Sequence, residues 1–153
     1  MTDRPCPRPL EARAPSRSDA KATPARGRGP LLFISGNREG RVLFARIAKR
    51  WDGVTLIFAD SGEEGLDMAR VRRPRIVVLD AQLSDCDGEK LVMALRERTM
   101  PPFAPIVVLA HDGAPSECAR FIWAGASAFI TKPLNVAEID RTVGELLEVV
   151  GLP

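Results

Sequence analysis

Five short apolar runs, each followed by a stretch with helical periodicity, constrain the fold of this sequence more than any other feature. Apolar residues follow one another in these runs without alternation, which indicates strands buried on both faces of a parallel sheet. Helices must then cross over between successive strands, and such crossovers are right-handed. The predicted fold is an α/β doubly wound (βα)5 three-layer sandwich with a five-stranded parallel sheet. The predicted strands are Leu31–Ile34, Val54–Ala59, Arg75–Asp80, Pro105–Leu109 and Ala128–Thr131.

Start and stop residues delimit the helices between these strands. Ser61 and Glu64 have the spacing of a capping box, and Asn135 and Glu138 form a second capping pair. The final helix carries apolar residues at spacings of three and four, the pattern of one inward-facing side. The helices are predicted over residues 42–51, from residue 61, and over residues 88–98, 116–124 and 135–150.

The first 30 residues differ in composition from the rest of the chain. They hold six of the 13 Pro residues, seven of the 22 Lys and Arg residues, and three of the 20 Asp and Glu residues. Such a segment cannot bury enough apolar surface to offset its ordering entropy, so residues 1–30 are predicted to be a disordered Pro/Arg-rich tail. Residues 31–150 are predicted to form one domain with a slight acidic excess. The basic excess of the whole chain therefore does not indicate a nucleic-acid partner.

Other partners and compartments are limited by composition as well. Cys6, Cys86 and Cys118 are scattered, with neither metal-ligand spacing nor a disulfide framework, which fits a reducing cytoplasm. No apolar stretch approaches the length that a membrane span needs. The predicted protein is cytoplasmic, with no membrane contact.

Two residues at predicted strand ends carry the chemistry. Ligands of open α/β sheets bind outside the carboxyl ends of the strands. Asp80 ends the most apolar strand, and Lys132 follows the last one. A carboxylate and an ammonium group at this edge suit phosphoryl transfer, since the carboxylate can attack phosphorus while the cation neutralises the transferred oxygens. A structural Asp–Lys pair across strand ends is the alternative. The sequence contains neither of the common glycine-rich phosphate loops.

Residues 31–150 resemble a response-regulator receiver domain of two-component signalling. The resemblance rests on the run Val77–Gly88, which contains Asp80, and on the run Gly125–Pro133, which contains Lys132. It implies a flavodoxin-like strand order and a phosphorelay in which Asp80 accepts a phosphoryl group from a sensor histidine kinase or a phosphotransfer protein. It also implies that Lys132 contacts this group and that Mg²⁺ bridges the site.

The sequence departs from the receiver pattern at three positions. An acidic pair that holds Mg²⁺ normally ends the first strand, where this chain has Ser35 and Gly36. Mg²⁺ is usually bound through one or two carboxylates, so Asp80 alone should bind it poorly. Glu39, about one helical turn further on, is the next acidic candidate. The fourth strand ends in Ala110, where the family has a Thr or Ser hydroxyl.

Three further residues are candidates near this site. His111 is predicted to be a partly exposed loop residue; the alternative is that its ring crowds or hydrogen-bonds the Asp80 pocket. Phe129 occupies the position of the family's switch aromatic, usually Tyr, and cannot hydrogen-bond. Trp123 is either packed or exposed, and an exposed Trp there would mark a partner surface beside Phe129 and the last helix.

Three functions follow as hypotheses. In the first, this is a single-domain response regulator, since the chain ends at Pro153 directly after the last helix; Asp80 is phosphorylated and a downstream protein partner or a second copy reads the change. In the second, it is a phosphorylation-independent pseudo-receiver that acts as an interaction module, because the acidic pair and the Thr or Ser are missing. The third, a small hydrolase using Asp80 and Lys132, lacks a positioned base, so no enzymatic activity is predicted.

Overall fold

The computed structural model describes residues 29–98, 104–111 and 114–150. Within these ranges five strands alternate with five helices along the chain. The strands are β1 (Gly29–Ile34), β2 (Val54–Ala59), β3 (Ile76–Asp80), β4 (Ile106–Ala110) and β5 (Ala128–Thr131). The helices are α2 (Arg38–Ala48), α3 (Gly62–Arg72), α4 (Gly88–Arg98), α5 (Pro115–Ala124) and α6 (Val136–Val150).

The strands form one parallel sheet in the order β2-β1-β3-β4-β5. This confirms the predicted doubly wound parallel sheet and its flavodoxin-like strand order. The chain runs outward from β1 to β2 and then crosses to the other side of β1 to form β3. The carboxyl ends of β1 and β3 therefore flank the switch point, where ligands of such sheets bind.

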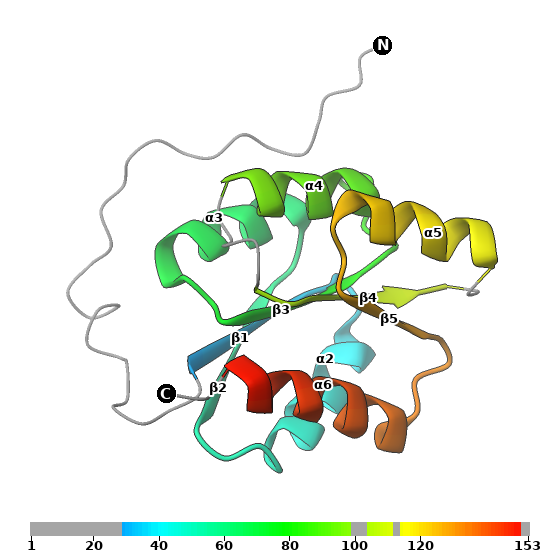
Figure 1. Cartoon of the computed structure of the whole chain (residues 1–153). Coiled ribbons are helices and arrows are strands. Elements are labelled where there is room, and N and C mark those ends of the chain that lie inside the picture. The colour runs from blue at the N-terminus through cyan, green and yellow to red at the C-terminus, as the bar shows by residue number, and fades with distance from the viewer. Residues whose placement is uncertain (1–28, 99–103, 112–113, 151–153) are drawn as a thin grey trace.

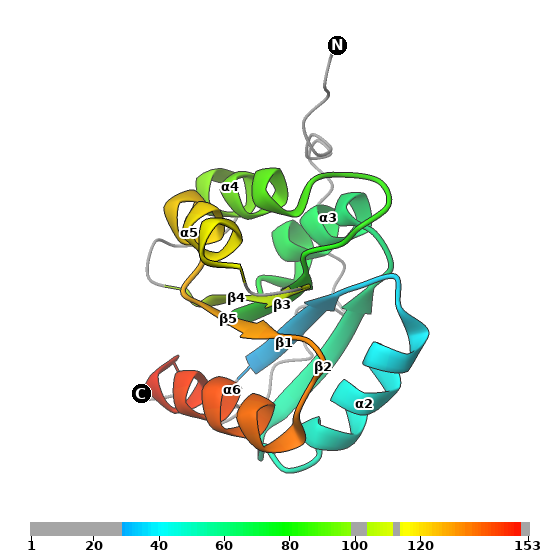
Figure 2. The ribbon, with the colours of Figure 1, turned by 90° about the vertical axis from the view of Figure 1, so that its right-hand side faces the viewer.

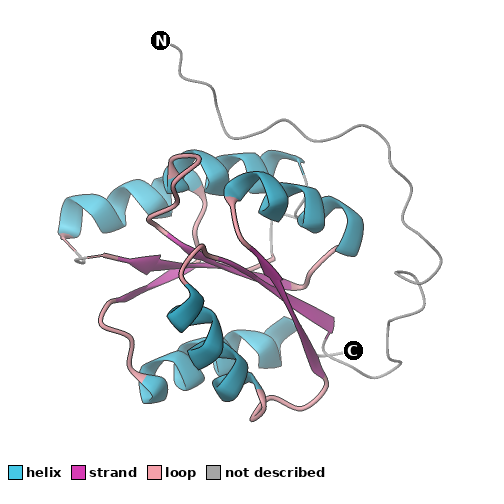
Figure 3. Cartoon of the chain, turned by 180° about the vertical axis from the view of Figure 1, so that it is seen from behind, coloured by secondary structure: helices cyan, strands magenta, loops and turns pink. Residues whose placement is uncertain are grey.

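Helices cover both faces of the sheet, which gives the predicted three layers. α3, α4 and α5 lie on one face and α2 and α6 on the other (Figures 1 and 2). The view from behind shows the sheet between these two helical layers (Figure 3).

Each face of the sheet has its own apolar core, because successive strand side chains point to opposite faces. Under α3, α4 and α5, the buried core includes Leu32, Val77, Leu79, Leu91 and Phe121. Under α2 and α6, it includes Leu31, Phe33, Phe44, Val78 and Ile139. All five residues of β3 are buried, as are all five of β4, so the middle of the sheet is a rigid support for the loops at its carboxyl edge.

Several element boundaries follow from side-chain caps. The Ser61 hydroxyl accepts from the Glu64 N–H at 3.1 Å, while the Glu64 carboxylate accepts from the Asp60 N–H at 2.8 Å. The predicted capping box is confirmed, with its reciprocal bond one residue earlier than expected. Asn135 likewise accepts from the Glu138 N–H at 3.1 Å.

Several element boundaries differ from the sequence prediction by one to four residues, among them the start of β1 and the end of α2. β1 begins at Gly29, because residues 29 and 30 pair with β2 although they lack the large apolar side chains on which the prediction relied. α2 ends at Ala48, and Trp51 lies beyond it. Trp51 is buried in the core under α2 and α6, and its indole N–H donates to Asp140 at 2.9 Å.

Some predictions concern residues outside the described ranges. The predicted disordered tail lies outside them up to residue 28, as does Cys6. Cys118 is buried and Cys86 is partly buried. Among the described residues, no helix has the length and apolar character needed to cross a membrane.

Candidate functional site

Asp80 is the centre of the candidate site. It is the last residue of β3 and is only 4% exposed. In the described ranges, one other polar residue is buried, namely Ser35, which directly follows β1. A carboxylate in such a position is costly unless charged and polar groups surround it. The residues around Asp80 therefore determine what this carboxylate can do.

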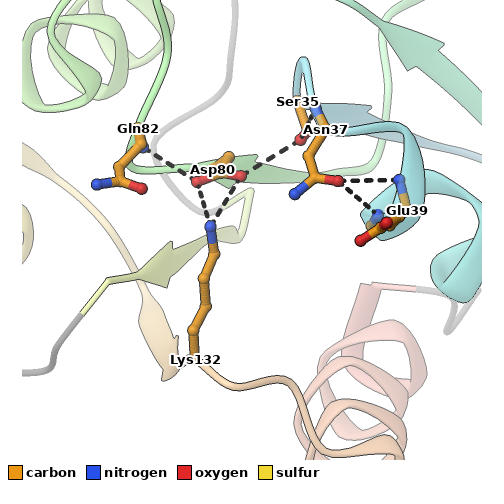
Figure 4. Close-up of polar contacts among 7 residues, drawn as sticks. Ser35, Asn37, Glu39, Asp80, Gln82 and Lys132 are labelled. Carbon is orange, nitrogen blue, oxygen red and sulfur yellow. Dashed lines mark hydrogen bonds and ion pairs between the residues drawn. The ribbon is translucent and has the colours of Figure 1, made fainter.

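Lys132 supplies the opposite charge. Its ammonium nitrogen lies 2.9 Å from Oδ1 and 3.1 Å from Oδ2 of Asp80 (Figure 4). Lys132 directly follows β5, and its backbone N–H donates to the Ala110 carbonyl at 2.9 Å, which continues the β4–β5 pairing. Two strand ends thus bring together the carboxylate and the ammonium group that the sequence singled out.

Ser35 and the loop after β3 complete the surroundings of Asp80. The Ser35 hydroxyl donates to Oδ2 at 3.3 Å and accepts from the Asn37 N–H at 3.0 Å. The Gln82 N–H donates to Oδ1 at 3.0 Å. Both carboxylate oxygens therefore accept more than one hydrogen bond, from the residues that directly follow β1 and β5 and from the loop after β3 (Figure 4).

The sequence prediction missed this role of Ser35. It treated the position only as the loss of an acidic residue, because it compared charges and not hydrogen-bonding groups. A hydroxyl at the end of the strand next to β3 was the available signal, since neighbouring strand ends meet at one edge.

The residues present do not fit a Mg²⁺ site. Mg²⁺ requires oxygen ligands in near-octahedral geometry and is usually held by one or two carboxylates together with other oxygens. Among the described residues that hydrogen-bond to Asp80, none brings a second carboxylate, and Lys132 contacts both Asp80 oxygens. Gly36 has no side chain to bind a metal, and Glu39 lies exposed in the first turn of α2. Across the described ranges, no three His, Cys, Asp or Glu side chains cluster as metal ligands.

Nearby acidic side chains are engaged elsewhere. Asp60 forms an ion pair with Arg41 at 2.8 Å. Asp85, which the sequence analysis did not single out, accepts from the N–H groups of Gly62 and Glu63 at 2.9 and 3.1 Å. It therefore caps the N-terminus of α3 from the loop between β3 and α4, a contact that no local capping pattern predicts.

The end of β4 contributes no donor side chain to the site. Ala110 is fully buried and offers only a methyl group. His111 follows it and is exposed, in agreement with the simpler of the two predictions. The hydrogen bonds described for Asp80 come from Lys132, Ser35 and Gln82 and do not include the His111 ring.

Phe129 and Trp123 lie in different environments. Phe129, in β5, is partly buried and packs against the core beneath α3, α4 and α5. Trp123, on α5, is 88% exposed, and its neighbour Ile122 is 45% exposed. The structure thus resolves the choice between a packed and an exposed Trp123 in favour of exposure.

Comparison with protein families gives one match over most of the chain. The family described as "Response regulator receiver domain" matches residues 34–144, a range that contains Ser35, Asp80 and Lys132.

The three curated relatives described here match this chain at 30% identity or less. The probable transcriptional regulatory protein TcrX of Mycobacterium tuberculosis is 29% identical over 106 residues, covering 69% of this chain and 44% of TcrX. The KDP operon transcriptional regulatory protein KdpE of Escherichia coli is 30% identical, covering 63% of this chain and 42% of KdpE. This chain therefore spans less than half the length of these two relatives. The polar-differentiation response regulator DivK of Brucella anthropi is 24% identical, covering 76% of this chain and 94% of DivK.

Solved structures share the fold. The chemotaxis response regulator CheY4 of Vibrio cholerae has a TM-score of 0.71 at 21% identity, covering 77% of this chain and 98% of that one. The signal receiver domain of a Luxo repressor protein from Vibrio parahaemolyticus has a TM-score of 0.73 at 18% identity, covering 80% and 92%.

Proposed function

This chain belongs to the response regulator receiver family of two-component signalling, and from that premise we propose that it accepts a phosphoryl group on Asp80. The donor is a sensor histidine kinase or a phosphotransfer protein. The observation that carries the proposal is the pairing of a buried strand-end carboxylate with the Lys132 ammonium group.

The proposed transfer is a substitution at phosphorus. An Asp80 carboxylate oxygen attacks the phosphorus of a phosphohistidine and forms an O–P bond. The P–N bond breaks, its electron pair stays on the imidazole nitrogen, and that nitrogen takes a proton from solvent. Lys132, within 3.1 Å of both Asp80 oxygens, compensates the negative charge of the acyl phosphate.

We propose that the transfer to Asp80 is slower than in receivers that keep the usual site residues. Ala110 offers no hydroxyl to the transferred oxygens, and the loss of one such donor costs on the order of 10²–10³ in rate in enzyme sites. The site also lacks the acidic pair that the family uses to hold Mg²⁺.

A second candidate function has its own support. Ser35, Gly36 and Ala110 remove three groups that receivers use in phosphorylation, while the sheet and both cores are intact. These departures favour a pseudo-receiver that binds partners without being phosphorylated.

Either function needs a surface that a partner can recognise. We propose the exposed side of α5 around Trp123, with a downstream protein or a second copy of this chain as the partner. Trp is enriched among the residues that dominate binding energy at interfaces, and Trp123 is exposed together with its neighbour Ile122.

Intact-mass measurement after incubation with acetyl phosphate, or with a candidate histidine kinase and ATP, tests the first function. We expect a slow gain of one phosphoryl group that is absent in Asp80→Asn. The matched control is Asp52→Asn, which changes an exposed carboxylate between α2 and β2 and should still be phosphorylated. No added mass with either donor would favour the pseudo-receiver.

A further inference from the structure

We infer that the Asp80 site works without a divalent cation: Lys132 is its resident cation, and Ser35 is its hydroxyl donor. The inference rests on the proposed role of the site. It concerns a separate question, however, namely which groups balance the charge of Asp80.

The charge of Asp80 is already balanced within the protein. Asp80 and Lys132 form a pair in which the ammonium group contacts both carboxylate oxygens, and both side chains are largely removed from water. A divalent cation would have to displace this contact. The cation would gain only the Asp80 carboxylate as a charged ligand. Mg²⁺ gives up its bound water reluctantly, so one carboxylate does not compensate for the water it would lose.

The Ser35 hydroxyl is oriented by its own hydrogen bonds. Its oxygen accepts from the Asn37 N–H, so its own hydrogen is directed to Oδ2 of Asp80. A hydroxyl held in this way donates to negatively charged oxygen. We therefore assign Ser35 the role of contacting a phosphoryl oxygen on Asp80, the kind of contact that Ala110 cannot make from β4.

Two other acidic side chains, Asp60 and Asp85, already have partners of their own. Asp60 is paired with Arg41, and Asp85 caps α3 through both of its oxygens. Breaking either arrangement would leave a cation or a helix terminus without its partner. A second carboxylate is therefore not at hand in the described part of the site.

The local geometry also permits a gain-of-function test. A Cβ at Gly36 would lie 3.4 Å from the Asp60 carbonyl oxygen, at the edge of ordinary contact, and Gly36 is exposed. Gly36→Asp is thus sterically tolerated. Ser35→Asp adds the second acid at a buried position beside Asp80.

Calorimetric titration of the full chain with MgCl2 in the millimolar range tests the inference. We expect no saturable heat for the unmodified chain, and no shift of its thermal midpoint between MgCl2 and EDTA. The variant Ser35→Asp with Gly36→Asp should show saturable binding that is lost when Asp80→Asn is added. If the double variant does not fold, Gly36→Asp alone serves in its place, with weaker binding expected.

Two outcomes would overturn the inference. One is saturable Mg²⁺ binding by the unmodified chain that Asp80→Asn abolishes. The other is a folded acidic variant that gains no Mg²⁺ binding, since Ser35 and Gly36 would then not be what excludes the ion. Neither outcome depends on whether Asp80 is phosphorylated, so failure here is distinguishable from failure of the proposed function.

The role of Ser35 has a separate readout. Ser35→Ala keeps the fold of β1 but removes the hydroxyl, and we expect slower phosphoryl gain on Asp80, with Ser35→Thr restoring part of the rate. An unchanged rate in Ser35→Ala would contradict this role.

Discussion

Lys132 and Asp80 are 52 positions apart in the chain, yet the Lys132 ammonium group lies 2.9 and 3.1 Å from the two Asp80 carboxylate oxygens. β4 separates their strands in the sheet, so the long Lys side chain reaches across a full strand end. This contact joins the middle of the sheet to its edge at the candidate site.

Removal of Lys132 should destabilise the protein through Asp80. Lys132→Met leaves a buried carboxylate without its cation, and we expect a loss of about 1–3 kcal/mol in the free energy of unfolding. In an Asp80→Asn background the same substitution should cost clearly less, because no charge is left uncompensated. Urea denaturation of the four proteins gives the coupling energy of the pair. An equal cost in both backgrounds would mean that the contact contributes no specific stability.

Arg96 should be required for the packing of α4 against the α5–β5 turn. Its guanidinium group donates to the Gly125 and Ala104 carbonyls and to the Ser127 hydroxyl, and burial lowers its pKa. We expect Arg96→Ala to cost about 2–3 kcal/mol, with Arg96→Lys only partly better, since one ammonium group cannot reproduce the fork of donors.

Denaturant midpoints check this expectation. Arg98→Ala, an exposed Arg on the same helix, is the matched control and should change stability by less than about 0.5 kcal/mol. If Arg96→Ala is as mild as this control, the three hydrogen bonds do not hold the turn.

Gly65 should not tolerate a methyl group. A Cβ there would lie 2.5 Å from Cδ1 of the fully buried Ile34, closer than packed carbons can approach. Gly65→Ala is expected to cost about 1–3 kcal/mol, and Ile34→Val should recover part of this loss because it removes that Cδ1 atom.

A glycine on another helix is the control for Gly65. A Cβ at Gly144 in α6 would meet nothing closer than 3.7 Å, so Gly144→Ala should stabilise the protein by up to about 1 kcal/mol through helix propensity. Thermal unfolding of both variants compares them directly. A stabilising Gly65→Ala would show that α3 lies further from β1 than described.

The exposure of Trp123 gives a prediction about the partner surface. Trp123→Ala should leave stability unchanged within about 0.5 kcal/mol but weaken partner binding or self-association. Because Trp51 is only 6% exposed, fluorescence of Trp123→Phe should shift to shorter wavelength and resist acrylamide quenching. Ser116→Ala changes another exposed residue of α5 and is the control, which should leave both stability and binding unchanged. Undiminished binding and self-association in Trp123→Ala would exclude this surface from the output.

The fold was predictable from sequence because each local signal agreed with the others. Apolar strands, capping pairs and strand-end polar residues all indicated one doubly wound sheet, and Asp80 and Lys132 meet because carboxyl ends of parallel strands share an edge. Strand order, in contrast, came only from the resemblance. Periodicity describes which residues are buried and does not say which strands are neighbours.

Two features of the site could not be predicted for physical reasons. Phe121, Ile122 and Trp123 are consecutive, so they cannot all face the core, and the pattern does not say which does; packing buries Phe121 and exposes the other two. The Asp85 cap joins the loop after β3 to the N-terminus of α3, which is more than 20 residues earlier in the chain, and only the fold brings them together. The Ser35 contact was within reach of the same strand-end argument that found Asp80.

The time course of phosphoryl incorporation, followed by intact mass in EDTA and in MgCl2, tests the central claim most directly. We predict slow incorporation at the same rate in both buffers, absent in Asp80→Asn, and faster and Mg²⁺-dependent in Ser35→Asp with Gly36→Asp. Incorporation that occurs only with MgCl2 in the unmodified chain would contradict the cation-free site. No incorporation in either buffer, from acetyl phosphate or from a kinase, would contradict phosphorylation of Asp80 itself.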